Sequence, residues 1–212
     1  MPRAAPEPAS SPQSWGDGQS DRSRQISLAA EALIMERASA TFSMLELGDR
    51  LETSRTLTYA YFDDRDAVIE AILRRHIALL KKEGLASDGA FEGLPTKERV
   101  VQYALIYMRH VQRFGPLLHY ILREVPQVIK LPRDVAGFFA GTSLRSARDL
   151  KKDLRLSPIE ALTVVEMMPA IPEELGRLLQ RGALEPADAE AVCRRLVENA
   201  YDALVPIKAS AN

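Results

Sequence analysis

The stretch that decides the fold runs from Ser43 to Val68 and reads SMLELGDRLETSRTLTYAYFDDRDAV. It contains two short helical segments, 43–51 and 54–62, and the start of a longer one. Ser43 and Glu46 have the spacing of a capping box, in which each side chain hydrogen-bonds to the backbone N–H of the other. Short helices bury too little surface to stand alone, so longer neighbours must brace them. The stretch therefore predicts a helix-turn-helix.

The second short helix carries hydroxyl groups and one guanidinium, which are the groups that reach phosphates and base edges. Leu57 and Phe62 are free to face the domain core. Thr58 and Tyr61 lie three residues apart and share a face with the start of the helix, so we expect this face to meet DNA. The predicted DNA-binding residues are Ser43, Ser54, Arg55, Thr56, Thr58, Tyr59 and Tyr61.

Helical periodicity continues on both sides of this stretch, and sustained alternation typical of strands is absent from the sequence. Ser157, Pro158 and Glu160 combine a second capping box with proline at the first helical position. Pro169 and Pro172 must kink or split the helix that follows. The remaining predicted helices span about 21–37, 64–85, 96–114, 116–129, 132–154, 157–182 and 186–205.

These segments predict an all-α chain with an N-terminal helix-turn-helix domain and an all-helical body. We expect a proline-rich disordered tail over 1–19 and a DNA-binding domain over 20–63. A connecting helix over 64–86 would lead to a ligand-binding and dimerisation domain over 95–207.

Composition excludes several classes of protein. The 212 residues are 46% hydrophobic and 27% charged with a net charge of −1, which is typical of a globular chain. We expect no membrane span and no signal peptide, and hence a cytoplasmic location. The single Cys193 precludes an intramolecular disulfide. His76, His110 and His119 lack the spacing of metal ligands, so we expect no metal, no cofactor and no enzyme activity.

The residues from Ser43 to Arg50, Ser54 to Phe62 and Asp63 to Val68, with Ala29-Ala30 before them, resemble the TetR family of bacterial transcriptional regulators. The resemblance covers about a quarter of the chain. It implies a homodimeric repressor that a small-molecule effector releases from a double-stranded DNA operator.

The sequence departs from the family pattern in both turns of the helix-turn-helix region. Ala38 and Glu52 stand where glycine is usual, and a non-glycine residue in a left-handed turn costs roughly 1 kcal/mol. Between residues 20 and 62 five arginines face six acidic residues, although DNA affinity comes largely from phosphate neutralisation. A helical, dimeric ligand-binding protein that has lost DNA binding is therefore the alternative interpretation.

The second half is rich in aromatic residues and methionines, which suit either a plain core or the lining of a cavity for a largely apolar effector. We expect a cavity bounded by 96–129, 132–154 and 157–182. The candidates are Tyr103, Tyr107, Met108, His110, Phe114, His119, Tyr120, Phe138, Phe139, Met167 and Met168. From these we predict ligand contacts for Met108, Phe114, His119, Tyr120 and Met167.

The last helix has an apolar stripe that includes Val192, Leu196, Ala200 and Leu204. We expect this stripe to form the seam of a homodimer, with the small side chains of Ala189 and Ala200 letting helices approach.

Overall fold

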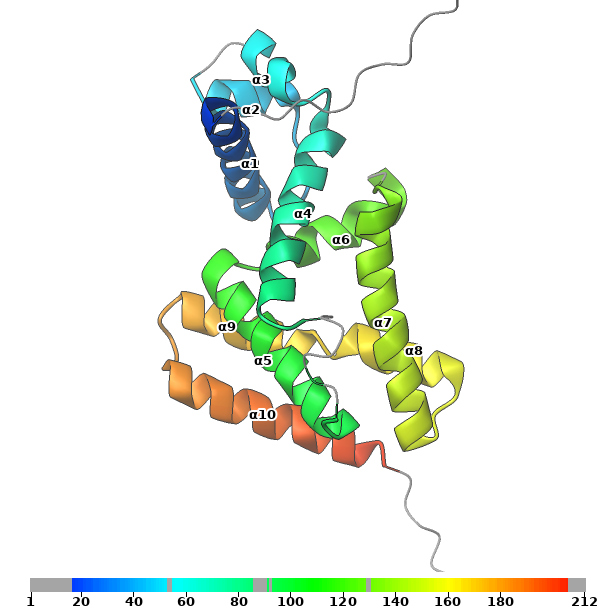
Figure 1. Cartoon of the computed structure of the whole chain (residues 1–212). Coiled ribbons are helices and arrows are strands. Elements are labelled where there is room, and N and C mark those ends of the chain that lie inside the picture. Colours follow the sequence, from blue (N-terminus) through cyan, green and yellow to red (C-terminus); the bar gives the residue numbers. More distant parts are fainter. Residues whose placement is uncertain (1–16, 53–54, 86–90, 92, 129–130, 206–212) are drawn as a thin grey trace, which may run out of the picture.

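The computed structural model describes residues 17–52, 55–85, 91, 93–128 and 131–205, and within these ranges every regular element is an α-helix (Figure 1). The all-α prediction is therefore confirmed. In chain order the helices are α1 (Asp17–Arg37), α2 (Met44–Arg50), α3 (Arg55–Tyr61), α4 (Arg65–Lys82), α5 (Thr96–Phe114), α6 (Leu117–Val128), α7 (Arg133–Leu154), α8 (Pro158–Met167), α9 (Ala170–Gln180) and α10 (Pro186–Ala203).

Two boundaries differ from the sequence prediction. Helix α1 begins at Asp17, inside the stretch 1–19 assigned to a tail, because no proline lies between Pro12 and the end of α1 and an acidic residue favours a helix N-terminus. Residues 1–16 lie outside the described residues. The segment 157–182 forms two helices that divide before Pro169, as the prolines in it predicted.

Both predicted capping boxes are confirmed. Ser43 and Glu46 exchange hydrogen bonds at the start of α2, with 2.8 Å from the Ser43 N–H to Glu46 Oε2. Ser157 and Glu160 do the same at the start of α8. Each helix therefore begins at the residue where its sequence satisfies the free backbone N–H groups.

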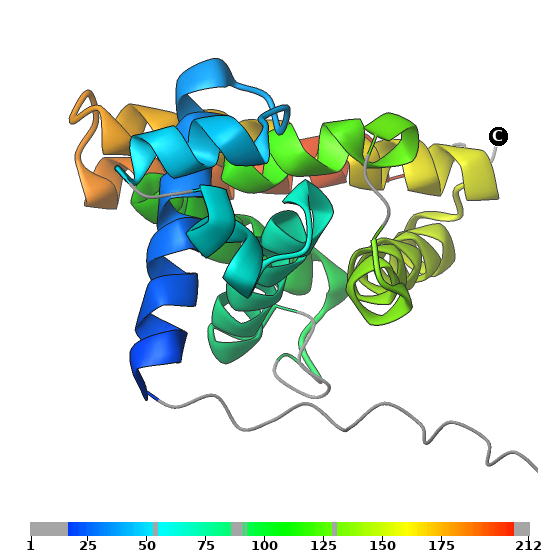
Figure 2. The ribbon, with the colours of Figure 1, turned by 90° about the horizontal axis from the view of Figure 1, so that it is seen from above.

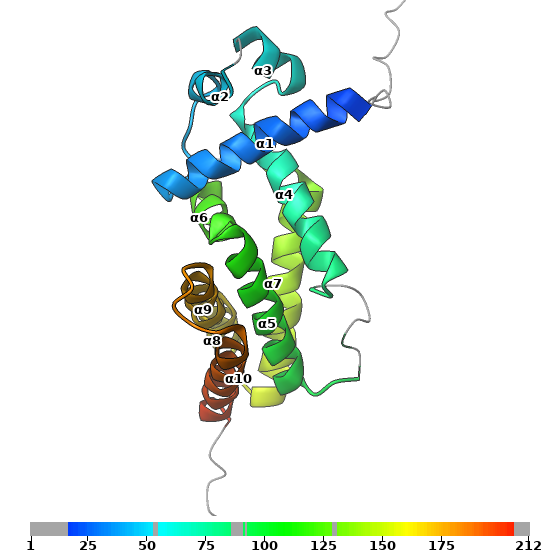
Figure 3. The same ribbon diagram turned by 90° about the vertical axis from the view of Figure 1, so that its left-hand side faces the viewer.

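The helix-turn-helix region occupies one end of the molecule, and α4 runs from this end into the body (Figure 1). Helix α1 and helix α7 lie on opposite sides of α4 (Figure 2). Helix α1 crosses α4 and α6, and it packs against both (Figure 3). The region formed by α1, α2 and α3, called the head below, thus rests on the body through α1 and α4.

Two apolar cores hold the fold together. The first joins the head to α4 and α6, and it buries the stripe predicted on α4, from Val68 to Leu80. The second joins α5 to α9 and α10, and it includes Cys193 and Val197. None of the described helices is both long and apolar enough to cross a bilayer.

Helices α5 and α9 approach each other closely at Gly176. A methyl group at this position would lie 2.7 Å from the carbonyl oxygen of Met108 and 2.7 Å from Cβ of Val111. Neither neighbour is the end of a flexible side chain, so neither can move aside cheaply. The absence of a side chain at residue 176 therefore sets the separation of these two helices.

We predict that Gly176→Ala lowers the free energy of unfolding by about 1–3 kcal/mol, because the new methyl group overpacks this contact. Gly137→Ala on α7 is the matched control, since nothing lies within 4 Å of its added methyl group. The control should gain about 0.5–1 kcal/mol from helix propensity. Urea denaturation measures both, and equal effects of the two substitutions would contradict the close contact.

Candidate functional site

The two turns of the head have the strained backbone that the sequence predicted. Ala38, after α1, has φ of 51°, and Glu52, between α2 and α3, has φ of 50°. Both angles lie in the left-handed region that favours glycine. The head therefore keeps the helix-turn-helix path in spite of two unfavourable residues.

The described side chains of α3 divide between the core and the surface. Thr58 is fully buried, so the prediction that it contacts DNA is wrong in this conformation. It lies four residues before the buried Phe62 and therefore falls on the same helical stripe. Tyr59 is 40% exposed, and Tyr61 is half-buried against the first core.

The other predicted DNA-binding residues are only partly described. Ser43 is exposed and caps α2. Ser54 lies outside the described residues, as do the side chains of Arg55 and Thr56.

Two arginines of the head are engaged by acidic residues of the head itself. Arg50 holds Glu36 through two hydrogen bonds of 2.6 and 2.8 Å. Arg37 lies 2.7 Å from Glu46, and this contact together with the Ser43 N–H lowers the pKa of Glu46 to about 2. These contacts join α1 to α2 on the surface, and they reduce the positive charge that the head presents to a polyanion.

A buried polar chain connects the head to the body. Nδ1 of His76 on α4 lies 2.9 Å from Nε2 of His110 on α5, and His76 Nε2 lies 3.4 Å from the Glu31 carboxylate on α1. Arg75 donates a hydrogen bond to the same carboxylate. The Phe114 ring packs edge-on against His76, with centroids 4.9 Å apart. We call Glu31, His76 and His110 the junction chain.

Burial keeps one member of this chain, His110, uncharged. Desolvation, with smaller contributions from His76, Arg113 and Arg75, lowers the pKa of His110 to about 3. His110 is therefore neutral at pH 7, and one of the two imidazoles donates the hydrogen bond that the other accepts. The sequence showed only that these histidines lack the spacing of metal ligands, and it did not predict their contact. Their positions among the apolar stripes of α4 and α5 were the available signal.

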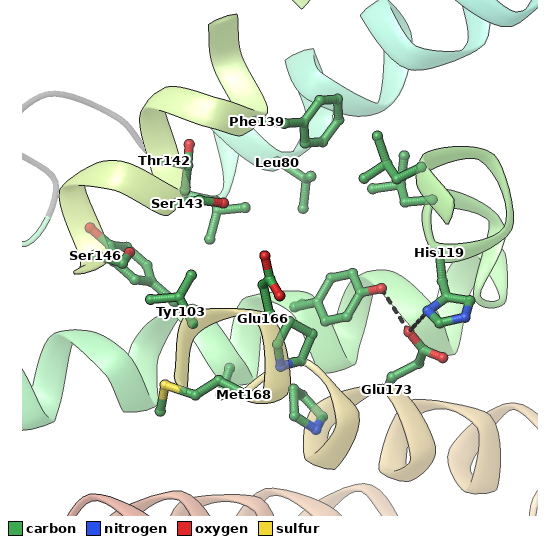
Figure 4. Close-up of a pocket in the computed structure, with 18 of the residues that line it drawn as sticks. Leu80, Tyr103, His119, Phe139, Thr142, Ser143, Ser146, Glu166, Met168 and Glu173 are labelled. Carbon is green, nitrogen blue, oxygen red and sulfur yellow. Dashed lines mark hydrogen bonds and ion pairs between the residues drawn. The ribbon is translucent and has the colours of Figure 1, made fainter. Parts of the chain in front are cut away.

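The body contains a partly open cavity of about 680 Å³, which is within the range that holds small ligands in proteins. It lies between the three segments predicted to bound it, and Pro169 and Pro172 are in its wall (Figure 4). The apolar lining comes mainly from the end of α4 and from α5, α6 and α7. These residues are Leu80, Leu85, Val100, Tyr103, Ala104, Tyr107, Leu118, Leu122, Phe138, Phe139, Leu150, Val165 and Met168.

A cluster of polar groups forms one end of the cavity (Figure 4). The buried carboxylate of Glu173 accepts a hydrogen bond of 3.1 Å from the Tyr107 hydroxyl and lies 3.3 Å from His119 Nδ1. Arg177 donates to it at 2.5 Å. Burial and the Glu173 charge raise the pKa of Tyr107, so its hydroxyl stays a donor. The charge of Glu173 is thus compensated within the protein.

The predicted ligand-binding residues are mostly displaced from this cavity. His119 lines it, whereas Met108 is fully buried in the second core and Met167 is 67% exposed. The structure places Tyr107 and Met168 at the cavity instead, in each case one residue away. A shift of one residue turns a side chain by about 100° around a helix, which periodicity alone does not resolve.

The two other predicted ligand-binding residues lie near the head. Phe114 packs on the junction chain, and Tyr120 packs against the first core. Among the described residues no three histidine, cysteine or acidic side chains gather as a metal site would require.

No family model matches the sequence, and no curated protein matches it. Several solved structures share the fold. A putative TetR-family transcriptional regulator from Rhodococcus sp. is 16% identical and aligns over 87% of this chain and 100% of its own, with a TM-score of 0.56. A TetR-family transcriptional regulator from Streptomyces coelicolor is 21% identical over 87% and 80% of the two chains, with a TM-score of 0.51.

A third similar structure is a TetR variant from Acinetobacter baumannii AYE in complex with minocycline. It is 14% identical and aligns over 91% of this chain and 95% of its own, with a TM-score of 0.50. The chain therefore has the fold of the TetR-family regulators, a helix-turn-helix head on an all-helical body, as the sequence resemblance implied.

We predict that the protein loses stability in acid through His110. Its pKa is about 3 in the folded chain and near 6.5 when exposed, so below about pH 6.5 the unfolded chain binds the proton more strongly. Stability is then lost as the pH falls from about 6.5 towards 3, by about 1.4 kcal/mol per pH unit.

Urea denaturation at a series of pH values measures this slope. The variant His110→Gln keeps a hydrogen-bonding group but does not titrate, so its slope should be shallower by up to that amount. Parallel pH profiles for the wild type and the variant would show that His110 is not held neutral by burial.

Proposed function

We propose that the chain is a ligand-responsive DNA-binding transcription regulator, a repressor that a small molecule releases from its operator. In this proposal residues 20–63 bind double-stranded DNA and the helix within 64–86 connects the head to the body. Residues 95–207 bind a largely apolar effector and form a homodimer in the cytoplasm. No catalytic step, metal or cofactor is part of this function.

The observation that carries the proposal is the direct connection between a helix-turn-helix and a ligand-sized cavity. Helix α4 starts next to α3 and contributes His76 to the junction chain. Near its end it places Leu80 in the cavity wall. Helix α5 likewise contributes both Tyr107 and His110. A ligand that changes the positions of α4 and α5 would therefore change the position of the head. The effect on DNA affinity would equal the ligand's differential affinity for the two arrangements.

A dimer is supported by apolar side chains that the single chain leaves exposed. On α10 the residues that face the chain's own core are Ala189, Cys193, Val197 and Tyr201. Of the predicted seam, Leu196 is 45% exposed, whereas Val192 and Leu204 pack against the chain's own second core. Ala189 belongs to the chain's own core, so its predicted place at the seam is wrong. An exposed leucine in a helix face that also carries Ala200 fits a helix–helix interface.

A ligand-binding protein without DNA binding is the second candidate, and the ion pairs of the head favour it. Arg37 and Arg50 are held by Glu46 and Glu36, and Glu52 adds an acidic side chain at the turn before α3. A gel-shift assay with DNA from upstream of the gene distinguishes the two candidates. Retardation of that DNA, but not of an unrelated fragment of equal length, supports the regulator.

We predict that Arg55→Ala weakens binding to such an operator and flattens the slope of log affinity against log salt by about one unit if Arg55 meets a phosphate. Glu52→Gly should tighten binding, because it removes a charge that repels phosphate and relieves a backbone φ of 50°. Fluorescence anisotropy over a range of salt concentrations measures both effects.

Lys152→Ala is the matched control for charge, since Lys152 is exposed near the C-terminal end of α7, away from the head. It should leave the affinity and the salt slope unchanged. If Arg55→Ala and Glu52→Gly also leave them unchanged, α3 is not the DNA-reading helix.

We predict that Leu196→Asp converts a homodimer into a folded monomer. A buried, unpaired carboxylate at the interface costs several kcal/mol, so the dimer should dissociate. The side chain at residue 196 is accessible in the single chain, so the monomer should stay folded. Light scattering should give twice the chain mass of 23.5 kDa for the wild type and the single mass for the variant, with unchanged circular dichroism. A wild type that is monomeric at micromolar concentration would refute this interface.

A further inference from the structure

The cavity wall carries one carboxylate, that of the exposed Glu166, with which no positive charge of the described residues pairs. Glu166 lies on α8, and its carboxylate points into the cavity between Leu80 and the wall formed by Met168 and the prolines (Figure 4). No hydrogen bond or ion pair joins it to any other described residue. The second carboxylate, Glu173, differs in this respect, because Tyr107, His119 and Arg177 surround it.

The surroundings of Glu166 suit a ligand that brings a positive charge. The hydroxyls of Ser143 and Ser146 line the same region and can accept hydrogen bonds from a ligand. The ring of Tyr103 also lines it, and aromatic faces attract cations. The rest of the lining is largely apolar, so a bound ligand that covers the exposed Glu166 carboxylate would exclude water from it and strengthen its attraction to an opposite charge.

One cationic side chain, Arg123 on α6, also lines the cavity. It is exposed, as Glu166 is, and no ion pair links the two side chains. Its long, flexible side chain can follow the rim into solvent, whereas the shorter Glu166 side chain points inward in Figure 4. The position of the carboxylate thus favours a cationic ligand over an anionic one.

We propose that the effector is a cationic amphiphile, with an amine or quaternary ammonium group beside Glu166 and an apolar body among Leu80, Leu118 and Phe139. The role of the ligand as an effector rests on the proposed function, whereas the cavity and its charges do not depend on DNA binding. Glu166 is the specificity-determining residue for the charged group, and the apolar wall determines the size of the body.

Isothermal titration with three ligands of one chain length tests the proposal. Decyltrimethylammonium, decanol and decanoate, each below its micelle concentration, supply a cation, a neutral group and an anion on the same apolar chain. The wild type should bind decyltrimethylammonium about tenfold more tightly than decanol, and decanoate more weakly than either. Glu166→Gln should abolish the preference for the cation and leave decanol affinity within about twofold.

Two matched variants control for general effects of charge. Glu174→Gln removes an exposed carboxylate from α9 outside the cavity and should preserve the preference for the cation. Arg123→Gln removes the cation of the cavity wall and should preserve or increase it. Melting temperatures within about 2 °C of the wild type would show that the variants stay folded.

The proposal is overturned if Glu166→Gln leaves the affinity for decyltrimethylammonium unchanged or if none of the three ligands binds. It is also overturned if decanoate binds most tightly and Arg123→Gln abolishes that binding. If the protein prefers the cation through Glu166 but does not retard DNA, the ligand class stands and the proposed function is wrong. If it binds the operator but shows no preference for the cation, the proposed function stands and the ligand class is wrong.

Discussion

The junction chain is the interaction on which the relation between head and body depends. Glu31, His76 and His110 come from three different helices, and each loses its water when α1, α4 and α5 pack together. A buried polar group that loses its partner costs about 1–3 kcal/mol, so the three helices are held in the one arrangement that pairs all three residues. Apolar packing around them supplies stability but would tolerate a range of positions. The hydrogen bonds therefore select the geometry that the hydrophobic cores stabilise.

The cavity uses the same helices as the junction chain. Tyr107 and His110 lie within one turn of α5, and His76 and Leu80 lie one turn apart on α4. A displacement of either helix at the cavity is thus carried to the junction without an intermediate element. The backbone between α5 and α6 adds a second contact, because Gly115 has φ of 68° and ψ of −175°, a conformation open essentially to glycine, beside Met35 of α1.

Local sequence signals predicted the helices well and the lining of the cavity poorly. Apolar periodicity and the breaks at Pro95 and Gly115-Pro116 act within a few residues, and they placed α5 correctly at both ends. Whether Tyr107 or Met108 faces the cavity depends on where α9 packs, which no local signal contains. The burial of Thr58 was predictable locally, because Thr58 lies four residues before Phe62, which the sequence assigned to the core. The junction chain was detectable in principle, because His76 and His110 interrupt apolar stripes at positions where a polar side chain needs a partner.

The walls of the cavity differ in how far they can move, because α5 and α9 are in close contact at Gly176. On one side α5 and α9 pack so closely that even a methyl group has no room, and this pair has the most extensive packing among the described helices. On the other side α7 packs chiefly against α8 and makes fewer contacts with α4 and α5. Helices α7 and α8 are joined by a turn at Arg155, whose φ is 57°. A bulky ligand would therefore displace α7 and α8 outward together, while α5 and α9 keep their positions. The size of the molecules that the protein can bind then depends on how far α7 and α8 can move, and not on the cavity volume alone.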